Sequence, residues 1–225
     1  MFFLFSFLLS LGFWQLNRLD QKTNLINCLD KRLNSAPVSI FTVLNSSNYF
    51  ADSWNWKSVK LVGVWDYKNN NIFLESRTLK GQSGVNIITP FFLINNLTIL
   101  INRGWFRFKD NYIVNFNLSE LPVVLTGVLR IKEYKSLFSP KNNVNKNEWH
   151  ILNIKQFSKY FGINFCLPFF IVSSKKSTNI ELVSLIPDLP NNHFSYAITW
   201  FSLSVVVFFM YLFYLRQRFS FYKVN

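Results

Sequence analysis

Residues 191–215 decide the fold class of the chain and read NNHFSYAITWFSLSVVVFFMYLFYL. Because no charged side chain occurs between Phe194 and Leu215, the stretch predicts a membrane-spanning helix about 33 Å long. His193, one of two histidines in the protein, stands directly before this apolar run. An ionisable ring at the mouth of a membrane helix is a candidate functional residue, so the same stretch also supplies the first candidate site.

A second apolar stretch, MFFLFSFLLSLGFWQL, occupies residues 1–16. It is about 24 Å long as a helix, and Trp14, Gln15 and Arg18 can extend it to the membrane interface. A signal peptide is the alternative, but the stretch has neither a basic segment before it nor a small-residue cleavage site after it. We therefore expect a transmembrane helix over residues 1–18.

The basic residues Arg216, Arg218 and Lys223 follow the second span. An excess of Lys and Arg beside a span marks the cytoplasmic or matrix side of the membrane. Both termini are therefore predicted on that side, with residues 216–225 as a basic tail. Residues 19–193 are expected outside, in a periplasm or intermembrane space.

The segment between the spans is predicted to form one β-rich domain. Residues 19–33 have helical spacing and either continue the first helix or form a short amphipathic helix, which Pro37 ends. A hairpin is expected around residues 68–70 and a type I′ turn at Asn95–Asn96. A short helix over residues 153–161 should end at Gly162. Strands are expected over residues 58–65, 71–76, 84–93, 97–102, 123–131 and 169–173.

The predicted fold class is therefore an α+β membrane protein with two transmembrane helices, over residues 1–18 and 194–215. They flank a single, mostly antiparallel β domain with minor helix.

Composition narrows the function. The net charge is +13, but Lys and Arg are scattered and no nucleic-acid motif occurs, which argues against a nucleic-acid partner. A solvated Lys-rich surface explains the charge, and attraction to membrane lipid or an acidic partner is the alternative. Cys28 and Cys166 lack the spacing of a metal or redox motif, so two free, partly buried thiols are favoured over a disulfide.

No enzyme motif appears in the sequence. There is no GxGxxG, P-loop, GxSxG or HExxH segment, and the 11 acidic residues are not grouped. A catalytic triad would have to use His150 or His193, neither of which stands near a recognisable nucleophile. The sequence therefore favours a binding protein over an enzyme.

The start of the last helix carries a candidate binding stripe. His193, Tyr196, Ala197 and Trp200 lie at helical spacing on one face. A neutral imidazole can bind haem iron, and the aromatic rings can pack against a porphyrin. The alternative is an ordinary interface belt, because Tyr and Trp gather at any membrane surface.

Three polar residues elsewhere are further candidates. Gln15 lies near the membrane and needs a partner. Arg18, on the same helical face, can meet a lipid headgroup or a haem propionate. Arg103 precedes Gly104, where a bulge or the end of a strand is expected. For Arg18 the alternative is a surface anchor, and for Arg103 it is a structural contact.

Four segments together carry a family resemblance: LGFWQLNRLDQK at residues 11–22, GQSGVNIITPFFL at 81–93, LINRGWF at 100–106 and NNHFSYAITWF at 191–201. They resemble the signature blocks of the surfeit-locus-one (Surf/Shy) family, assembly factors for haem-copper cytochrome c oxidase. The blocks stand in the family's order. Residues 37–55 and 123–190 are similar only in general character.

The resemblance implies a role in maturation of the largest oxidase subunit around haem a insertion. Its partners would be that subunit and other assembly factors. Some members bind haem a with a histidine implicated, and His193 matches the histidine of its block. His193 would then bind the iron, while Trp14, Tyr196 and Trp200 line an apolar slot and Arg18 or Arg103 meets the propionates.

The implied location is the mitochondrial inner membrane or a bacterial cytoplasmic membrane. No transit peptide precedes the first helix, which favours a bacterial or organelle-encoded protein. The alternative function is a permanent accessory subunit of a respiratory complex with no cofactor of its own. A copper carrier is disfavoured, because Cys28 and Cys166 form no clustered thiolate site.

Overall fold

The computed structural model describes residues 2–49, 52–66, 71–107, 121–133, 140–174, 180–183 and 189–222. The chain divides into two compact units. One comprises Met1–Asp30 with Pro187–Asn225, and the other comprises Lys31–Ile186. Each unit is described by itself.

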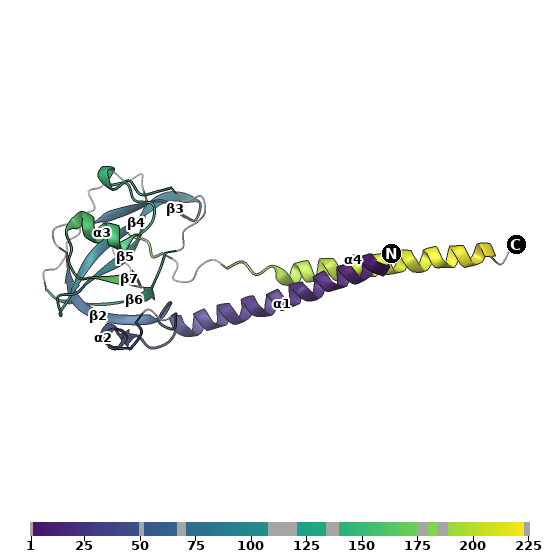
Figure 1. The fold of residues 1–225 in the computed structure, drawn as a ribbon, viewed down its shortest axis with the longest axis horizontal. Coiled ribbons are helices and arrows are strands. Elements are labelled where there is room, and N and C mark those ends of the chain that lie inside the picture. The colour runs from purple at the N-terminus through teal and green to yellow at the C-terminus, as the bar shows by residue number, and fades with distance from the viewer. Residues whose placement is uncertain are drawn as a thin grey trace. The chain divides into compact units, whose positions relative to one another are not determined.

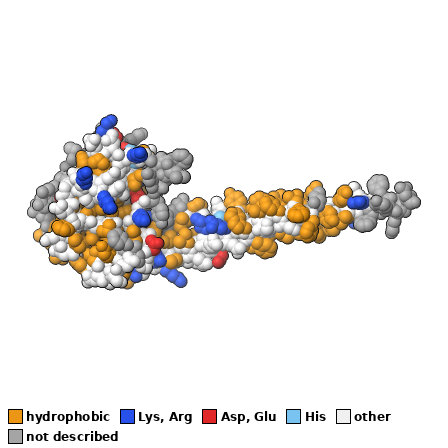
Figure 2. All heavy atoms as spheres, viewed as in Figure 1, with side chains coloured by type: hydrophobic (Ala, Val, Ile, Leu, Met, Phe, Trp, Pro, Cys, Tyr) orange, Lys and Arg blue, Asp and Glu red, His pale blue; other side chains and the backbone are white. Residues whose placement is uncertain are grey.

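Two long helices, α1 (Phe2–Leu33) and α4 (His193–Tyr222), make up the first unit. They run antiparallel, because Gln15 contacts His193 whereas Phe5 contacts Phe208. Both are long and apolar enough to cross a membrane. Hydrophobic side chains cover most of the helix pair on the face seen in Figure 2. The α+β class with two apolar terminal helices is confirmed.

The helix boundaries settle one alternative that the sequence left open. α1 is one continuous helix, so residues 19–33 continue the first span rather than forming a separate element. It ends at Leu33, before Pro37. α4 begins at His193, one residue before the predicted span, and continues beyond Leu215 to Tyr222.

Residues spaced alternately three and four apart form the contact between the helices, the pattern of antiparallel 3–4 packing. Gly12, Ala197 and Ser204 are all buried on this seam, and small residues allow membrane helices to approach closely. The buried and half-buried seam positions are Phe5, Leu8, Gly12, Gln15, Leu19 and Lys22 on α1, and His193, Ala197, Trp200, Ser204, Val207 and Tyr211 on α4.

The second unit is a β domain whose described residues form a seven-stranded sheet in the order β1-β2-β6-β7-β5-β4-β3. A further pairing between β2 and β4 closes strands β2, β6, β7, β5 and β4 into a ring (Figure 1). The β1–β2 and β5–β7 pairs are parallel and the others antiparallel. The strands are β1 (Val38–Ser39), β2 (Ser58–Trp65), β3 (Ile72–Leu79), β4 (Gln82–Leu93), β5 (Thr98–Arg107), β6 (Val123–Arg130) and β7 (Cys166–Ser173).

Residues of the ring strands contribute to two larger cores and to a smaller cluster of Val85, Ile87, Phe106 and Ile180. Leu61, Phe91 and Phe169 belong to the core enclosed by the ring, which Ile40 and Val43 of α2 (Ile40–Leu44) complete. The second core lies on the outer face of the ring. There Trp149 and Phe157, the latter from α3 (Ile154–Phe161), cover Ile72, Leu74, Ile88, Leu100, Phe170 and Val172.

Two turn predictions are wrong. β2 and β3 are not paired with each other among the described residues, although the turn residues 67–70 themselves lie outside that description. Instead both strands pair with β4, β2 at Phe91–Leu93 and β3 at Gln82–Ile88. The β4–β5 turn is not type I′, because only Asn96 has a positive φ (61°). A hydrogen bond from Asn96 N to Leu93 O closes the three-residue loop.

The other elements agree with the sequence patterns or extend them. α3 has Asn153 as its N-cap and ends at Gly162, which has a φ of 63°. β3, β4, β5 and β7 are longer than expected, and the segment 141–147 includes a single 3₁₀ turn, Val144–Lys146. β1 and α2 had no counterpart in the sequence analysis.

Candidate functional site

A hydrogen bond joins the two helices at the start of α4. His193 Nδ1 lies 2.7 Å from Gln15 Oε1. Gln15 is buried, with 9% of its surface exposed, and His193 is half-buried. An amide oxygen only accepts hydrogen bonds, so this geometry requires the proton on Nδ1 and leaves the lone pair of a neutral ring on Nε2. The structure thus brings together two of the predicted site residues.

Local packing explains why these two side chains meet. Both occupy the seam, and Ala197, one turn after His193, is 1% exposed and adds little bulk. A second polar contact runs from Nδ2 of Asn191, just before α4, to Oγ1 of Thr23 on α1 at 3.3 Å. The sequence analysis did not identify Asn191 and Thr23 as partners.

Aromatic contacts close one flank of the helix pair. The ring centroids of Phe13 and Phe201 are 5.4 Å apart, and those of Phe5 and Phe208 are 5.6 Å apart. A Cβ added at Gly12 would lie 2.5 Å from Cε1 of Phe201, so the Phe201 ring rests directly on this glycine. Phenylalanine rings of the two helices therefore pack against each other on this flank.

The opposite flank carries the other predicted residues of the helix pair. Successive helical residues turn by about 100°, which places Trp14 and Arg18 on the other side of the seam from Phe13. In an antiparallel partner the same geometry places Tyr196 and Trp200 on the side away from Phe201. Trp14 and Tyr196 are 52% and 55% exposed. One flank beside the Gln15–His193 pair is thus lined by aromatic side chains.

Arg18 lies at this flank with its guanidinium directed along its own helix. Its Nη1 donates a hydrogen bond of 3.0 Å to Gln21 Oε1. The side chain is exposed, so its charge remains accessible to an anion. The amide oxygen of Gln15 is hydrogen-bonded to His193, so Arg18 bonds Gln21 rather than Gln15.

Arg103 belongs to the β domain, where a bulge determines its position. Gly104 pairs with Ile87 and Asn102 with Ile88, so Arg103 is the extra residue of β5. Gly104 has a φ of 136°, which confirms the expected bulge, but the strand does not end there.

The side chain of Arg103 is buried against an aromatic ring. Its Cζ lies 4.9 Å from the centroid of Trp65, and burial lowers its pKa to about 10. A stacked, desolvated guanidinium of this kind contributes to packing inside the domain. These contacts fit the structural interpretation of Arg103, and its propionate role stays a prediction.

The two cysteines and His150 lie in separate parts of the chain, with Cys28 on α1 and Cys166 in β7. Cys28 and Cys166 are both free, as expected, although Cys28 is exposed rather than partly buried. Burial raises the pKa of the Cys166 thiol. His150 lies in the β domain, where its carbonyl accepts a hydrogen bond from Arg77. Within the described ranges, no three His, Cys, Asp or Glu side chains are grouped as a metal site.

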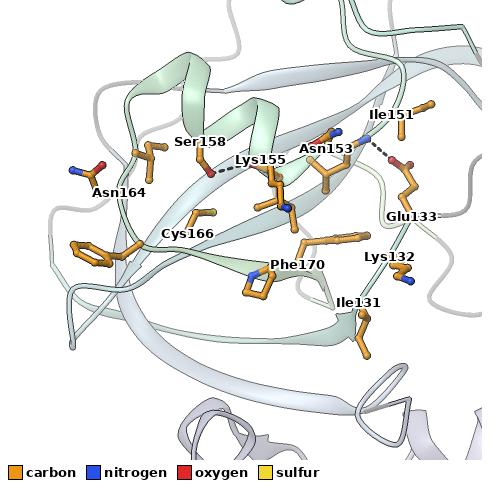
Figure 3. A pocket seen from close by; sticks show the side chains of 15 residues that line it. Ile131, Lys132, Glu133, Ile151, Asn153, Lys155, Ser158, Asn164, Cys166 and Phe170 are labelled. Atoms are coloured by element: carbon orange, nitrogen blue, oxygen red, sulfur yellow. Dashed lines mark hydrogen bonds between the residues drawn. The ribbon is translucent and has the colours of Figure 1, made fainter. Parts of the chain in front are cut away.

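An open pocket of about 850 Å³ lies between α3, the residues after β6 and the start of β7. In Figure 3, Lys132 and Lys155 border it, and Cys166 and Phe170 line it from β7. Its acidic residue, Glu133, forms an ion pair with Arg77 and accepts a hydrogen bond from Leu152 N. The pocket thus combines two lysines with apolar side chains.

Fold and site together define an α+β protein in which a small β ring accompanies two helices apolar enough to cross a membrane. The model of the SURF1 family matches residues 2–205. The chain belongs to the SURF1 family, which confirms the resemblance seen in the sequence blocks.

Its relatives are similar over most of their length. The SURF1-like protein of Rickettsia conorii is 28% identical over 223 residues, covering 96% of this chain and 90% of that protein. Surfeit locus protein 1 of Gallus gallus is 29% identical, covering 89% of this chain and 69% of that protein. Surfeit locus protein 1 of Homo sapiens is 27% identical, covering 86% of this chain and 69% of that protein.

Proposed function

We propose that this chain is an assembly factor for haem-copper cytochrome c oxidase that acts on the largest subunit around haem a insertion. The SURF1 family is a family of oxidase assembly factors rather than a known class of enzymes, which supports the coarse role. The 2.7 Å contact between His193 Nδ1 and Gln15 Oε1 supports the more specific role in haem a insertion. It holds an imidazole at the end of an apolar span with Nε2 available for a metal.

The residues of the helix pair fit haem a. Bound haem supplies an iron that accepts a nitrogen ligand, and His193 Nε2 is the nitrogen that this ring can offer. Trp14, Tyr196 and Trp200 can pack against a flat apolar ring. The exposed Arg18 can pair with a propionate through its guanidinium.

The proposed location follows from the charge pattern. α4 would cross the mitochondrial inner membrane or a bacterial cytoplasmic membrane, with Arg216 and Arg218 on the matrix or cytoplasmic side. His193 would then lie at the outer surface, with the β domain in the intermembrane space or periplasm. The proposed partners are the largest oxidase subunit, other assembly factors and the surrounding lipid.

Purification from cells that make haem a tests the proposal. The wild-type chain should retain haem a absorbance, and His193→Ala should lose it. His150→Gln is the matched control, because it removes the only other histidine of the sequence and should keep the absorbance. Equal haem a content in wild type and His193→Ala would remove the ligand assignment. Unit stoichiometry in the mature oxidase would instead indicate a permanent accessory subunit.

A further inference from the structure

The partly buried contact between Gln15 and His193 determines which nitrogen of the ring carries the hydrogen. An imidazole has two nitrogens, and a neutral ring protonates only one of them. The 2.7 Å separation between Nδ1 and Oε1 is short for an N–H···O hydrogen bond. Since the amide oxygen cannot donate, the contact selects the ring form with a hydrogen on Nδ1.

We infer that Gln15 is a positioning residue that fixes His193 in this form and keeps Nε2 as its metal-binding nitrogen. The inference rests on the proposed function only where iron is concerned, because the ring form exists in the protein without haem. Histidine ligands commonly donate their second ring nitrogen to a nearby acceptor, which sets the ring orientation and the coordinating atom. Here a neutral amide from the other helix is that acceptor.

The neighbours of Gln15 on α1 leave its amide oxygen to the imidazole. Gln15 follows Gly12 on the seam, where the lack of a side chain lets α4 approach. Arg18, the cation one turn away, donates to Gln21 and leaves the Gln15 oxygen to the imidazole. A buried acceptor that lost its donor would be left unsatisfied at a cost in free energy, so the amide and the ring favour one shared arrangement.

A Gln15 amide turned the other way would select the other form of the His193 ring. If the amide were turned so that its nitrogen donated to Nδ1, the ring would carry its hydrogen on Nε2. The lone pair would then lie on the nitrogen that faces Gln15, and the outward nitrogen would be blocked for metal binding. The two arrangements therefore differ in a property that nitrogen NMR measures directly.

The test uses the full-length chain in detergent, without haem, with ¹⁵N-labelled histidine. In a His150→Gln background His193 is the only histidine, so its two nitrogen shifts are unambiguous. We expect hydrogen on Nδ1 and a lone pair on Nε2 in the Gln15 protein. Hydrogen on Nε2 with the lone pair on Nδ1 would overturn the inference, whatever the variants do.

Substitutions at position 15 supply the second arm. Gln15→Leu removes the acceptor at similar volume and should give a mixture of both ring forms. Gln15→Glu keeps an acceptor and should restore hydrogen on Nδ1. Asn24→Leu is the matched control, an exposed amide of the same helix that bonds Asp20 instead, and should leave the shifts unchanged. Wild-type shifts in Gln15→Leu would also overturn the inference.

Titration with ferric haem separates this inference from the proposed function. Gln15→Leu should weaken haem binding by about 10–100-fold, the usual effect of losing a ligand's hydrogen-bond partner. Hydrogen on Nδ1 with no haem bound by the wild type would defeat the proposed function and leave the positioning role intact. Haem binding together with hydrogen on Nε2 would defeat the positioning role of Gln15 and leave the proposed function intact.

Discussion

At the residue scale, buried polar groups occupy positions that the backbone prepares for them. Arg103 points into the β domain because Gly104 allows a bulge in β5. Gln15 reaches His193 because Gly12 and Ala197 keep the helices close. The sequence identified Gln15, Arg103 and His193 as candidates from residue type, but it could not pair Gln15 with His193. That pairing depends on the relative register of two helices separated by the whole β domain.

Substitution of Gly104 tests the bulge. Gly104→Ala should destabilise the full-length chain by more than about 1–3 kcal/mol, because alanine is strained at this positive φ. Its Cβ would also lie 2.4 Å from Glu181 O. Chemical denaturation followed by tryptophan fluorescence measures the change.

Gly81→Ala is the matched control for this effect. Gly81 also has a positive φ, of 75°, but a Cβ there meets nothing within 4 Å. It should cost only the conformational strain, about 1–2 kcal/mol. Equal losses of unfolding free energy at both positions would mean that the contact with Glu181 does not contribute to the destabilisation.

The two cysteines should differ in reactivity towards a thiol reagent. Alkylation proceeds through the thiolate, and burial raises the pKa of Cys166 whereas Cys28 is exposed. At neutral pH the reagent should modify Cys28 first, and the Cys166 rate should increase only at higher pH. Mass spectrometry of timed samples measures both rates, and faster modification of Cys166 would contradict its burial.

At the element scale, helix and strand types followed from periodicity, whereas pairing did not. The N-cap and C-cap residues of α3 were identifiable because Asn153 and Gly162 have local roles. The β2–β3 hairpin was wrong because strand pairing depends on closure of the ring through β4, a nonlocal event. On α4 the predicted stripe included Tyr196, which is exposed, and missed Ser204, which is buried on the seam. An apolar membrane helix offers little polarity contrast by which to distinguish its faces.

Gly12 provides a test of the helix seam. Gly12→Leu should separate the helices or displace the Phe201 ring, because even a Cβ at this position comes within 2.5 Å of that ring. Overpacking of this kind typically costs about 1–3 kcal/mol. Thermal unfolding in detergent measures the loss, which Phe201→Ala in the same chain should partly restore.

Ser10→Leu is the control for this substitution. Ser10 is exposed on α1 and bonds only to its own helix, through Phe7 O. The change adds similar volume away from the seam and should leave the unfolding temperature nearly unchanged. Equal destabilisation by Ser10→Leu and Gly12→Leu would argue against the seam as described.

At the scale of the whole molecule, composition predicted the α+β class and the two apolar helices. It did not predict closure of the β ring, because that depends on contacts between distant strands such as β2 and β4. The family blocks cover both helices and the bulge, where local sequence and local geometry coincide. The proposed orientation rests on charge alone and has a direct test.

A membrane-impermeant thiol reagent tests the orientation. In sealed spheroplasts or mitoplasts, Cys28 should react, because it lies beyond the first apolar stretch. A thiol introduced by Gln217→Cys, between Arg216 and Arg218, should react only after the membrane is opened. Labelling of the Gln217→Cys thiol in sealed membranes would reverse the proposed orientation.

The central claim is that His193 supports delivery of haem a to the oxidase. Its most direct test is the haem a content of the largest oxidase subunit, isolated from cells that lack this chain and carry a plasmid copy. Wild type and His150→Gln should restore haem a, whereas His193→Ala, expressed at the same level, should leave the subunit deficient in it. Full haem a content with His193→Ala would contradict the account.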